Sequence, residues 1–155
     1  FAALLEDGSV VTWGHPDFGG DSSVVQDRLR EVQAIHATQF AFAAILADGS
    51  AITWGDLECD DSPSTDHELR SARQVQGNKF GARAAVLADG SVVTWGDAHY
   101  GGDSSAVQDQ LQNVQQIGAT DHAFAALMED GSLVTWGYAD YGGDSSRIQE
   151  QLAFL

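Results

Sequence analysis

The sequence predicts a mainly β fold in which four tandem repeats form sheets that stack radially or in a line. Three observations support this prediction. The segment FAALLEDGSVVTWG at residues 1–14 recurs, with substitutions, at residues 42–55, 83–96 and 124–137. The Asp-Gly pairs and the Trp residues of these segments follow one another at intervals of 41 residues, a period typical of repeat architectures. Apolar runs on both sides of each Asp-Gly pair favour a buried hairpin. The repeats of this single domain span about residues 1–41, 42–82, 83–123 and 124–155.

Each repeat begins with a predicted β-hairpin that turns at its Asp-Gly pair. Such a pair favours a type I′ turn, because both central residues of that turn need φ > 0. With Asp7-Gly8 at the centre, Ala2 pairs with Trp13 and Ala3 pairs with Thr12. Both faces of the hairpin are then apolar and should be covered, and the small Ala leaves room for the Trp. We interpret the four Trp residues as core residues; a stacking platform for a ligand is the alternative. The predicted turns are Asp7-Gly8, Asp48-Gly49, Asp89-Gly90 and Asp130-Gly131.

A glycine bend and a short helix should follow each hairpin. Apolar residues at Val107, Leu111 and Val114 have helical spacing, and Ser105 with Gln108 has the form of a capping box. We predict about two turns of helix at residues 23–31 and at the equivalent positions; a short, irregular outer strand is the alternative. The bend sequence GGDSS lies at residues 19–23, 101–105 and 142–146, and DDSPS replaces it at residues 60–64.

A third strand is predicted where each repeat ends. It has the pattern V-Q-x-I at Val32 and Val114, and it lies near Val75 in the second repeat, where a compensated slip of one residue indicates a local loop change. The first hairpin then has no preceding strand, and the fourth such strand would begin at Leu155. We expect these repeats not to form a closed ring alone and the chain to be a segment of a longer polypeptide; a ring closed by the ends of this chain is the alternative.

Composition argues against several function classes. The chain has 23 acidic and 7 basic residues and a net charge of −16, which is unsuited to neutralising nucleic-acid phosphates or to an anionic membrane surface. Apolar runs fall short of the roughly 18 residues that a membrane helix requires. We therefore expect a soluble protein, intracellular or organellar rather than secreted, whose protein partner has a basic surface. Cys59 is the single cysteine, so an intrachain disulfide is excluded.

Sequence signals for catalysis or cofactor binding are weak. The five His residues share no repeat position and no zinc-ligand spacing, and the phosphate-loop and GxSxG motifs are missing. A nucleophilic Ser in GGDSS is disfavoured, because its presence in three repeats is typical of a structural bend. Calcium held by Asp21, Asp103 and Asp144 is an alternative with one carboxylate per repeat. We predict no catalytic residue, no cofactor and no metal.

The pattern A-L-x-x-D-G-x-V-x-x-W-G, followed by a Gly-containing bend, resembles the repeat of the regulator of chromosome condensation family. The resemblance covers all four repeats and implies a β-propeller, of which this chain would form a part. The repeat is shorter than the usual one of that family. It is more similar to the repeats of bacterial β-lactamase-inhibitor propellers and to short repeats in proteins of unicellular algae. GGDS replaces the family's G-Q-L-G, and no nucleotide-exchange surface is matched, so only the sheet architecture is transferred.

These observations favour a non-enzymatic protein-interaction or scaffold module. One form of this hypothesis is an accessory subunit docked on a large assembly, such as an algal photosynthetic one. The alternatives are a ligand-binding or enzymatic propeller with a site at the ring centre, and a regulatory propeller similar to an exchange factor. Variation between repeats concentrates at residues 15–18, 56–59, 97–100 and 138–141, as expected for a loop surface that contacts one asymmetric partner. The predicted partner-binding residues are Asp17, Phe18, His99, Tyr100, Tyr138, Asp140 and Tyr141.

Overall fold

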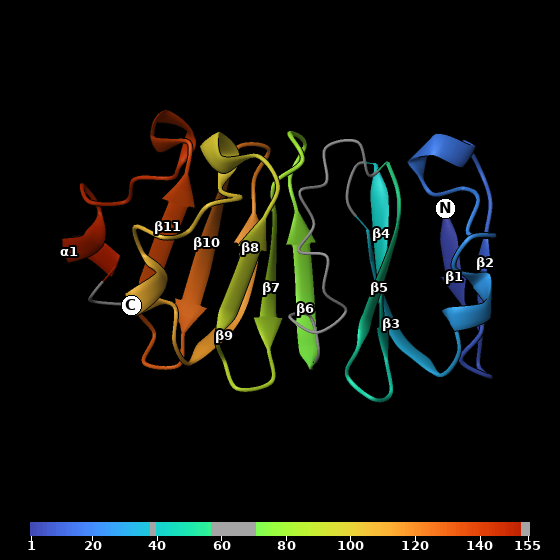
Figure 1. The fold of residues 1–155 in the computed structure, drawn as a ribbon. Helices are drawn as coiled ribbons and strands as arrows, with labels where there is room; N and C mark the ends of the chain where they lie inside the picture. Colours follow the sequence, from blue (N-terminus) through green and yellow to red (C-terminus); the bar gives the residue numbers. More distant parts are fainter. Residues whose placement is uncertain (38–39, 57–70, 153–155) are drawn as a thin grey trace.

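The protein is a row of four antiparallel sheets, seen in a computed structural model that describes residues 1–37, 40–56 and 71–152 (Figure 1). The first sheet has two strands and the other three have three each, in the orders β3-β4-β5, β6-β7-β8 and β11-β10-β9. This confirms the mainly β repeat fold. The strands are β1 (Ala2–Leu4), β2 (Val10–Thr12), β3 (Val32–Ala37), β4 (Ala41–Leu46), β5 (Ala51–Gly55), β6 (Ala72–Gly77), β7 (Arg83–Leu87), β8 (Val92–Trp95), β9 (Val114–Ala119), β10 (Ala123–Met128) and β11 (Leu133–Gly137).

Short helices join the sheets. Within the described residues, five are single 3-10 turns and one is a short α-helix after the last sheet. The bend and helix expected in the second repeat, together with Cys59, lie outside the described residues. The helices are η1 (Pro16–Phe18), η2 (Gln26–Arg28), η3 (Ala98–Tyr100), η4 (Gln108–Gln110), η5 (Ala139–Tyr141) and α1 (Gln149–Leu152).

The hairpin turns lie at the predicted Asp-Gly pairs, but the type I′ assignment is wrong. Gly8 has φ of 78°, whereas Asp7 is not among the residues with positive φ. The Gly8 N–H donates to the Leu5 carbonyl at 3.0 Å, and the Leu5 N–H donates to the Ser9 carbonyl at 2.9 Å. This is a tight turn followed by a glycine bulge. The Asp7 carboxylate accepts hydrogen bonds from the hydroxyl and the N–H of Ser9, which lower the pKa of Asp7.

The extra turn residue shifts the hairpin register by one. Ala2 pairs with Thr12 rather than with Trp13, so the predicted pairing is wrong. In the second sheet, Trp54 pairs with Phe42, and the two rings are stacked with centroids 5.4 Å apart. Each Trp therefore shares a face of its sheet with the aromatic residue opposite it, except that Arg83 takes the place of the Phe in the third sheet.

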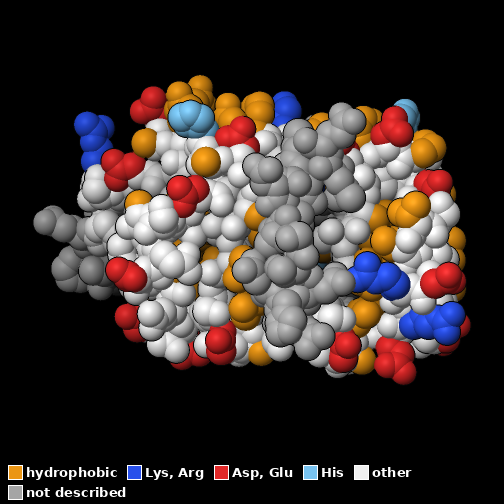
Figure 2. All heavy atoms as spheres, viewed as in Figure 1, with side chains coloured by type: hydrophobic (Ala, Val, Ile, Leu, Met, Phe, Trp, Pro, Cys, Tyr) orange, Lys and Arg blue, Asp and Glu red, His pale blue; other side chains and the backbone are white. Residues whose placement is uncertain are grey.

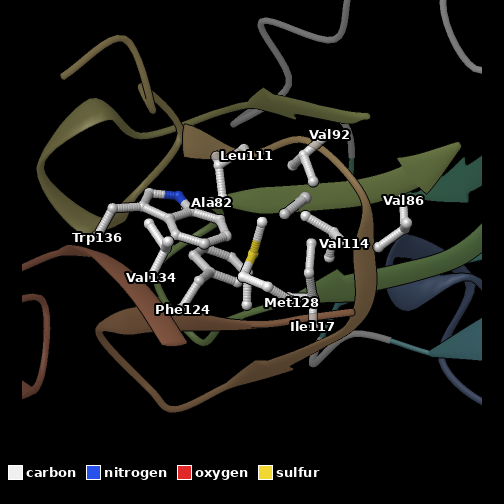
Figure 3. Packing of buried hydrophobic residues seen from close by; sticks show 12 residues of the cluster. Ala82, Val86, Val92, Leu111, Val114, Ile117, Phe124, Met128, Val134 and Trp136 are labelled. Atoms are coloured by element: carbon white, nitrogen blue, oxygen red, sulfur yellow. The ribbon is translucent and has the colours of Figure 1, made fainter. Parts of the chain in front are cut away.

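The core consists of three buried clusters, one at each contact between successive sheets, which we call junctions. At the third junction, Phe124, Val134 and Trp136 of the last sheet pack against Val86 and Val92 of the sheet before it (Figure 3). Opposite faces of the internal sheets thus contribute to different clusters. The expectation that both faces of a hairpin are covered is confirmed for these internal sheets, because a sheet with two apolar faces needs a neighbour on each side.

The Trp residues are core residues at all three junctions. Trp54, Trp95 and Trp136 are 1%, 3% and 4% exposed, which confirms the interpretation for these copies. Trp13 is 51% exposed, so the interpretation is wrong for the first copy. The reason is tertiary: the Trp-bearing face of β1 and β2 packs on no other sheet among the described residues.

The segment after each of the three described bends is helical but shorter than predicted. The turns η2 and η4 span three residues each, and α1 spans four. The capping box is wrong, because the hydroxyl of Ser22, not Ser23, contacts the amide of Gln26 at 2.7 Å. The same amide donates to the Val10 carbonyl at 3.0 Å, and Thr12 contacts the Ser22 hydroxyl at 2.9 Å. These bonds tie the helical turn to the outer strand β2.

The third strands are confirmed as β3, β6 and β9, and each pairs with the hairpin that follows it. The first sheet therefore has only β1 and β2, as expected. The two ends of the row lie apart in Figure 1. A Cβ built on Gly131 or Gly142 in the last sheet region meets no described atom within 4 Å. The closed ring of four sheets is therefore wrong for this structure.

Candidate interaction surface

Three of the four variable tetrapeptides form the turns η1, η3 and η5, which lie along one edge of the row (Figure 1). The tetrapeptide at residues 56–59 lies, apart from Asp56, outside the described residues. Each turn ends at a left-handed glycine, with φ of 83° at Gly19, 103° at Gly101 and 106° at Gly142. In η3 the Asp97 carboxylate also accepts the His99 N–H at 2.9 Å. The chain therefore presents side chains at this edge from tight, locally fixed turns.

Five rings gather at one part of this edge. Tyr100 stacks on Phe80 with centroids 4.4 Å apart, and His122 stacks on Tyr141 at 4.5 Å. Phe80 and His122 are 4.8 Å apart and join the two pairs, and Tyr138 lies 5.4 Å from Tyr141. Separations of this size are those of favourable aromatic pairs. The turns η3 and η5 and two strand-connecting loops thus build one continuous aromatic surface.

A second group of three rings lies nearer the amino-terminal end of the row of sheets. Phe18 is 4.8 Å from His15 and 5.1 Å from Phe40. Phe40 and Phe80 line the same pocket of about 240 Å³, which connects the two groups. We call the whole set the aromatic rim. Its members are His15, Phe18, Phe40, Phe80, Tyr100, His122, Tyr138 and Tyr141.

The loop that presents Phe80 is held by the buried side chain of Asn78. Its Oδ1 accepts the N–H groups of Phe80 and Ala82, each at 3.1 Å. Its Nδ2 donates to the carbonyl of Tyr100 at 2.7 Å. One amide therefore fixes two rim positions relative to each other. The compensated slip of the second repeat ends in this loop, so the irregularity in the sequence corresponds to a structured ring-bearing turn.

The seven predicted residues all lie in or beside η1, η3 and η5. Phe18, Tyr100, Tyr138 and Tyr141 belong to the rim, and Tyr141 is 60% exposed. The others are exposed polar residues at the same turns. The Asp17 Oδ2 lies 3.8 Å from the Nδ1 of His15. His99 and Asp140 contact no rim ring in the described part of the chain. The structure therefore brings the three Tyr residues together, places Phe18 in the second group of rings, and leaves these polar members beside them.

The sequence prediction did not include Phe40, Phe80 and His122. They lie in the loops that connect β3 to β4, β6 to β7 and β9 to β10. A signal existed, because each ring lies within two residues before Ala41, Ala82 or Ala123, and these alanines are spaced by 41 residues. Only the fold shows that these loops meet the variable turns at one edge.

The charge beside the rim is mostly negative. Figure 2 shows hydrophobic, histidine and acidic side chains along the edge that carries η1, η3 and η5. Two cationic side chains line the connecting pocket: Lys79, whose Nζ lies 5.9 Å from the Phe80 ring centre, and Arg83, which is 5% exposed. Seven exposed carboxylates lie within three residues of a rim ring in the sequence. They are Asp17, Asp21, Asp97, Asp103, Asp121, Asp140 and Asp144.

The aspartates of the glycine bends have local roles. Asp21 accepts the Ser23 N–H at 2.9 Å, and Asp103 and Asp144 accept the equivalent N–H groups of Ser105 and Ser146. These backbone bonds lower the pKa of all three carboxyls. Within the described residues, no three His, Cys, Asp or Glu side chains are grouped to hold a metal. That same part of the chain contains no helix long and apolar enough to span a membrane.

Comparison with known proteins gives evidence at the level of the fold. No protein-family model matches the sequence, and no curated protein matches it. Among solved structures, yeast RCC1 (Prp20) bound to Kap60 is similar with a TM-score of 0.64 and 19% identity, over 88% of this chain and 41% of that one. Prp20p from Saccharomyces cerevisiae, in a structure whose description concerns binding to Gsp1p and histones, has a TM-score of 0.63 and 19% identity over 88% and 42% of the two chains.

Human WBSCR16 is also similar, with a TM-score of 0.56 and 20% identity, over 88% of this chain and 44% of that one. The chain thus spans less than half the length of these proteins. At this identity the likeness shows the fold alone, which is that of a propeller of the regulator of chromosome condensation type. The four sheets correspond to part of such a propeller.

Proposed function

We propose that this chain is a non-enzymatic protein-interaction module that binds a basic segment of a partner protein along its aromatic rim. The observation that carries the proposal is the rim itself: rings from η1, η3 and η5 and from three strand-connecting loops form two groups of contacting rings at one edge, and Phe40 and Phe80 of the two groups line one pocket. Rigid aromatic residues are typical of the residues that contribute most binding energy at protein interfaces. The buried Trp residues of the repeats, in contrast, belong to the core.

The charge around the rim favours a cationic partner. Arginine and lysine side chains are attracted to the faces of aromatic rings and to carboxylates. Both are exposed at this edge, for example at Tyr141 and its neighbour Asp140. The net charge of −16 would in addition accelerate the encounter with a basic partner. A phosphate-bearing ligand is itself negative, so the acidic surface would repel it.

The similar solved structures are compatible with this proposal. Yeast RCC1 was solved in a complex with Kap60, and the description of the other Prp20p structure concerns binding to Gsp1p and histones, so these propellers bind proteins. A fold does not determine a function, and the rim residues of this chain carry the argument here. In its most specific form the proposal is an accessory subunit docked on a large assembly, such as an algal photosynthetic one.

Fluorescence anisotropy with a labelled arginine-rich peptide tests the proposal. We expect saturable binding that weakens as salt is added, because surface charges are screened. Tyr141→Ala should weaken binding on the order of tenfold, since truncation of an interface aromatic typically costs more than 1 kcal/mol. Val24→Ala is the matched control, because Val24 is 89% exposed and is not part of the rim.

A second variant separates the rings from the charge. Asp140→Asn removes one carboxylate and keeps Tyr141, so we expect a smaller loss of affinity and a weaker dependence on salt. Equal affinity for the parent, Tyr141→Ala and Asp140→Asn proteins would contradict the proposal. A peptide of the same length rich in glutamate should not bind, and its binding with similar affinity would also contradict it.

A further inference from the structure

The pocket that connects the two groups of rim rings lies between the second and third sheets. Its walls come from the β3–β4 loop, the residue after β5, the β6–β7 loop and the first residue of β7. Each of these two sheets has a neighbouring sheet on both sides, so the pocket belongs to the interior of the row (Figure 1). Phe40 and Phe80 line it, and its volume is about 240 Å³. A partly apolar pocket with a few polar side chains is the usual form of a small-ligand site.

Positive charge is concentrated at this pocket. The chain has 7 basic residues against 23 acidic ones, and two of the bases, Lys79 and Arg83, line the pocket. Asp56 is the one carboxylate among its described lining residues, so the side chains there leave an excess of one positive charge. Carboxylates flank the rest of the rim. The pocket therefore has the opposite sign to the surface around it, and it attracts a small anion that the rest of the rim repels.

Arg83 occupies a position that Phe takes in the other three repeats. The equivalent residues Phe42 and Phe124 stack on the Trp opposite them, with ring centres 5.4 Å and 5.3 Å apart. Arg83 pairs with Trp95 in the same register, and only 5% of it is exposed. Removal of a guanidinium from water costs free energy that a Phe at this position would not incur. Departures of this kind from a local rule are expected at functional sites.

Hydrogen bonds and close packing fix the backbone around the pocket. The buried Asn78 side chain accepts two N–H groups of its own loop and donates to a carbonyl of η3 at 2.7 Å. The Asp56 N–H donates to the Phe40 carbonyl at 2.9 Å. A Cβ on Gly96 would overlap the Gly81 carbonyl, so the β6–β7 loop packs closely on the end of β8. A preformed pocket lowers the cost of ordering loops and side chains on binding.

We infer that this pocket binds a small monocarboxylate that carries one aromatic ring. The ring of the ligand packs against Phe40 and Phe80, since aromatic pairs are favourable at such contacts. Its carboxylate accepts hydrogen bonds from Lys79 and Arg83, and the planar guanidinium of arginine suits a carboxylate in particular. The site lies within the aromatic rim but takes a ligand of opposite charge to a basic segment, so it goes beyond the proposed function and does not depend on it.

Size and charge restrict the ligand further. Pockets for drug-sized ligands have volumes of about 300–1,000 Å³, so a pocket of about 240 Å³ admits one ring and a short acid group. A single negative charge on the ligand balances the excess of one positive charge at the pocket. A phosphate ester carries a charge of about −1.5 to −2 near neutral pH, which exceeds that balance. Phenylacetate is therefore a suitable probe of the pocket.

NMR titration of the protein with four small probes tests the inference. Phenylacetate should bind saturably with a Kd in the millimolar range or tighter, and the largest shift changes should lie at the amides of the β6–β7 loop. Phenylacetamide has the ring without the charge, acetate has the charge without the ring, and benzylamine has the opposite charge. Each of these three should bind about tenfold more weakly or less. Equal binding of phenylacetate and phenylacetamide would overturn the inference, as would shift changes confined to other elements.

Three variants test the two cations of the pocket. Arg83→Phe restores the residue found at positions 42 and 124, so it should fold, and it should weaken phenylacetate binding by about tenfold. Lys79→Gln should weaken it by about twofold to fivefold, because Lys79 is exposed. Arg30→Gln is the matched control, since Arg30 is exposed and does not line the pocket. Unchanged binding in both pocket variants would overturn the inference, and far-UV circular dichroism establishes that each variant is folded.

The arginine-rich peptide gives a readout that separates this inference from the proposed function. Arg83→Phe and Lys79→Gln each remove a cation, so neither should weaken binding of that peptide to the rim. Peptide binding without phenylacetate binding would overturn the inference and leave the proposed function in place. Phenylacetate binding without peptide binding would contradict the proposed function and support the inference.

Discussion

The Trp residue near the end of each hairpin has two environments in this molecule. At the internal junctions Trp54, Trp95 and Trp136 are almost completely buried, whereas Trp13 at the first sheet is 51% exposed. The turn glycines differ in the same way. A Cβ built on Gly90 would lie against Asn113, just before the first strand of the next sheet, whereas a Cβ built on Gly131 would meet no described atom within 4 Å. The segments themselves are nearly identical in sequence. Burial of a repeat residue is thus a property of the neighbouring sheet, and equivalent substitutions should have unequal effects.

The largest difference is expected between Trp95→Ala and Trp13→Ala. Truncation of a buried aromatic typically costs about 3–5 kcal/mol, because transfer free energy is lost and a cavity remains. Trp13→Ala should cost no more than about 1 kcal/mol, since its side chain is half exposed. Urea unfolding of both variants, followed by circular dichroism, measures the difference. Equal losses would show that the Trp13 face is covered in solution, and measurement at high dilution would separate coverage by a second copy from coverage within the chain.

A comparison of turn glycines tests the junction backbone. Gly90 and Gly131 have φ of 80° and 84°, so Ala at either position has the same left-handed strain of about 1–2 kcal/mol. At Gly90 the added Cβ would also lie 2.9 Å from the Asn113 Cα, which should add about 1–3 kcal/mol of overpacking. Gly90→Ala should therefore melt at a lower temperature than Gly131→Ala in a thermal unfolding experiment. Identical melting temperatures would contradict the close approach at Gly90.

The internal junctions differ in the hydrogen bonding of their Trp residues, and comparison of Trp54→Phe with Trp95→Phe tests this difference. Trp54 donates to the Gly19 carbonyl, whereas the buried Nε1 of Trp95 has no partner among the described residues. Trp54→Phe leaves the Gly19 carbonyl unpaired, so it should cost about 1–2 kcal/mol more than Trp95→Phe. Urea denaturation of the two variants gives the comparison. A larger loss for Trp95→Phe than for Trp54→Phe would contradict this expectation.

The smallest difference is expected at the turn carboxylates, which depend on local contacts alone. The Ser91 hydroxyl and N–H lower the pKa of Asp89, and Ser132 lowers the pKa of Asp130 in the same way. Because these pKa values are depressed in the folded state, the stabilisation is present above the ordinary value near 3.8 and is lost as the pH falls through the folded value. Asp89→Asn and Asp130→Asn should therefore remove the same acid-dependent stability.

Unfolding of both Asn variants at neutral and acidic pH measures this effect. The parent should lose stability on acidification relative to each variant, and the two differences should agree. A larger effect at Asp89 would mean that the junction beside it, and not the turn alone, contributes to the pKa. The comparison thus separates the part of each repeat that is local from the part that needs a neighbour.

Sequence reasoning predicted the period, the turn positions, the third strands and the unpaired first hairpin, because each depends on a short pattern. It failed by one residue in the register, because the Asp7 side chain bonds to Ser9 and leaves only Gly8 with positive φ. It also overestimated the helices, since the Gln26 amide bonds to the strand rather than to the start of a helix. Side-chain bonds of this kind depend on competing partners that no spacing rule ranks.

The candidate surface was predicted in part. Variation between repeats indicated the turns that carry Phe18, Tyr100 and Tyr141, because a variable turn in a regular repeat is visible in one sequence. Phe80 and His122 were missed, since they belong to different loops whose approach to those turns requires the sheets to be packed. The role of the surface in binding stays a prediction.

The sequence by itself determined what lies within a few residues: the Asp-Gly turns, the bends, the strands and the repeat of their spacing. Hydrogen bonds between near neighbours and the alternation of side chains along a strand are sufficient for these features. Only the tertiary structure decided that Trp54 is core and Trp13 is surface, and that rings 20 or more residues apart, such as Phe80 and Tyr100, stack at one edge. Both outcomes depend on which sheet lies next to which, and burial of apolar surface acts between sheets, not along the chain.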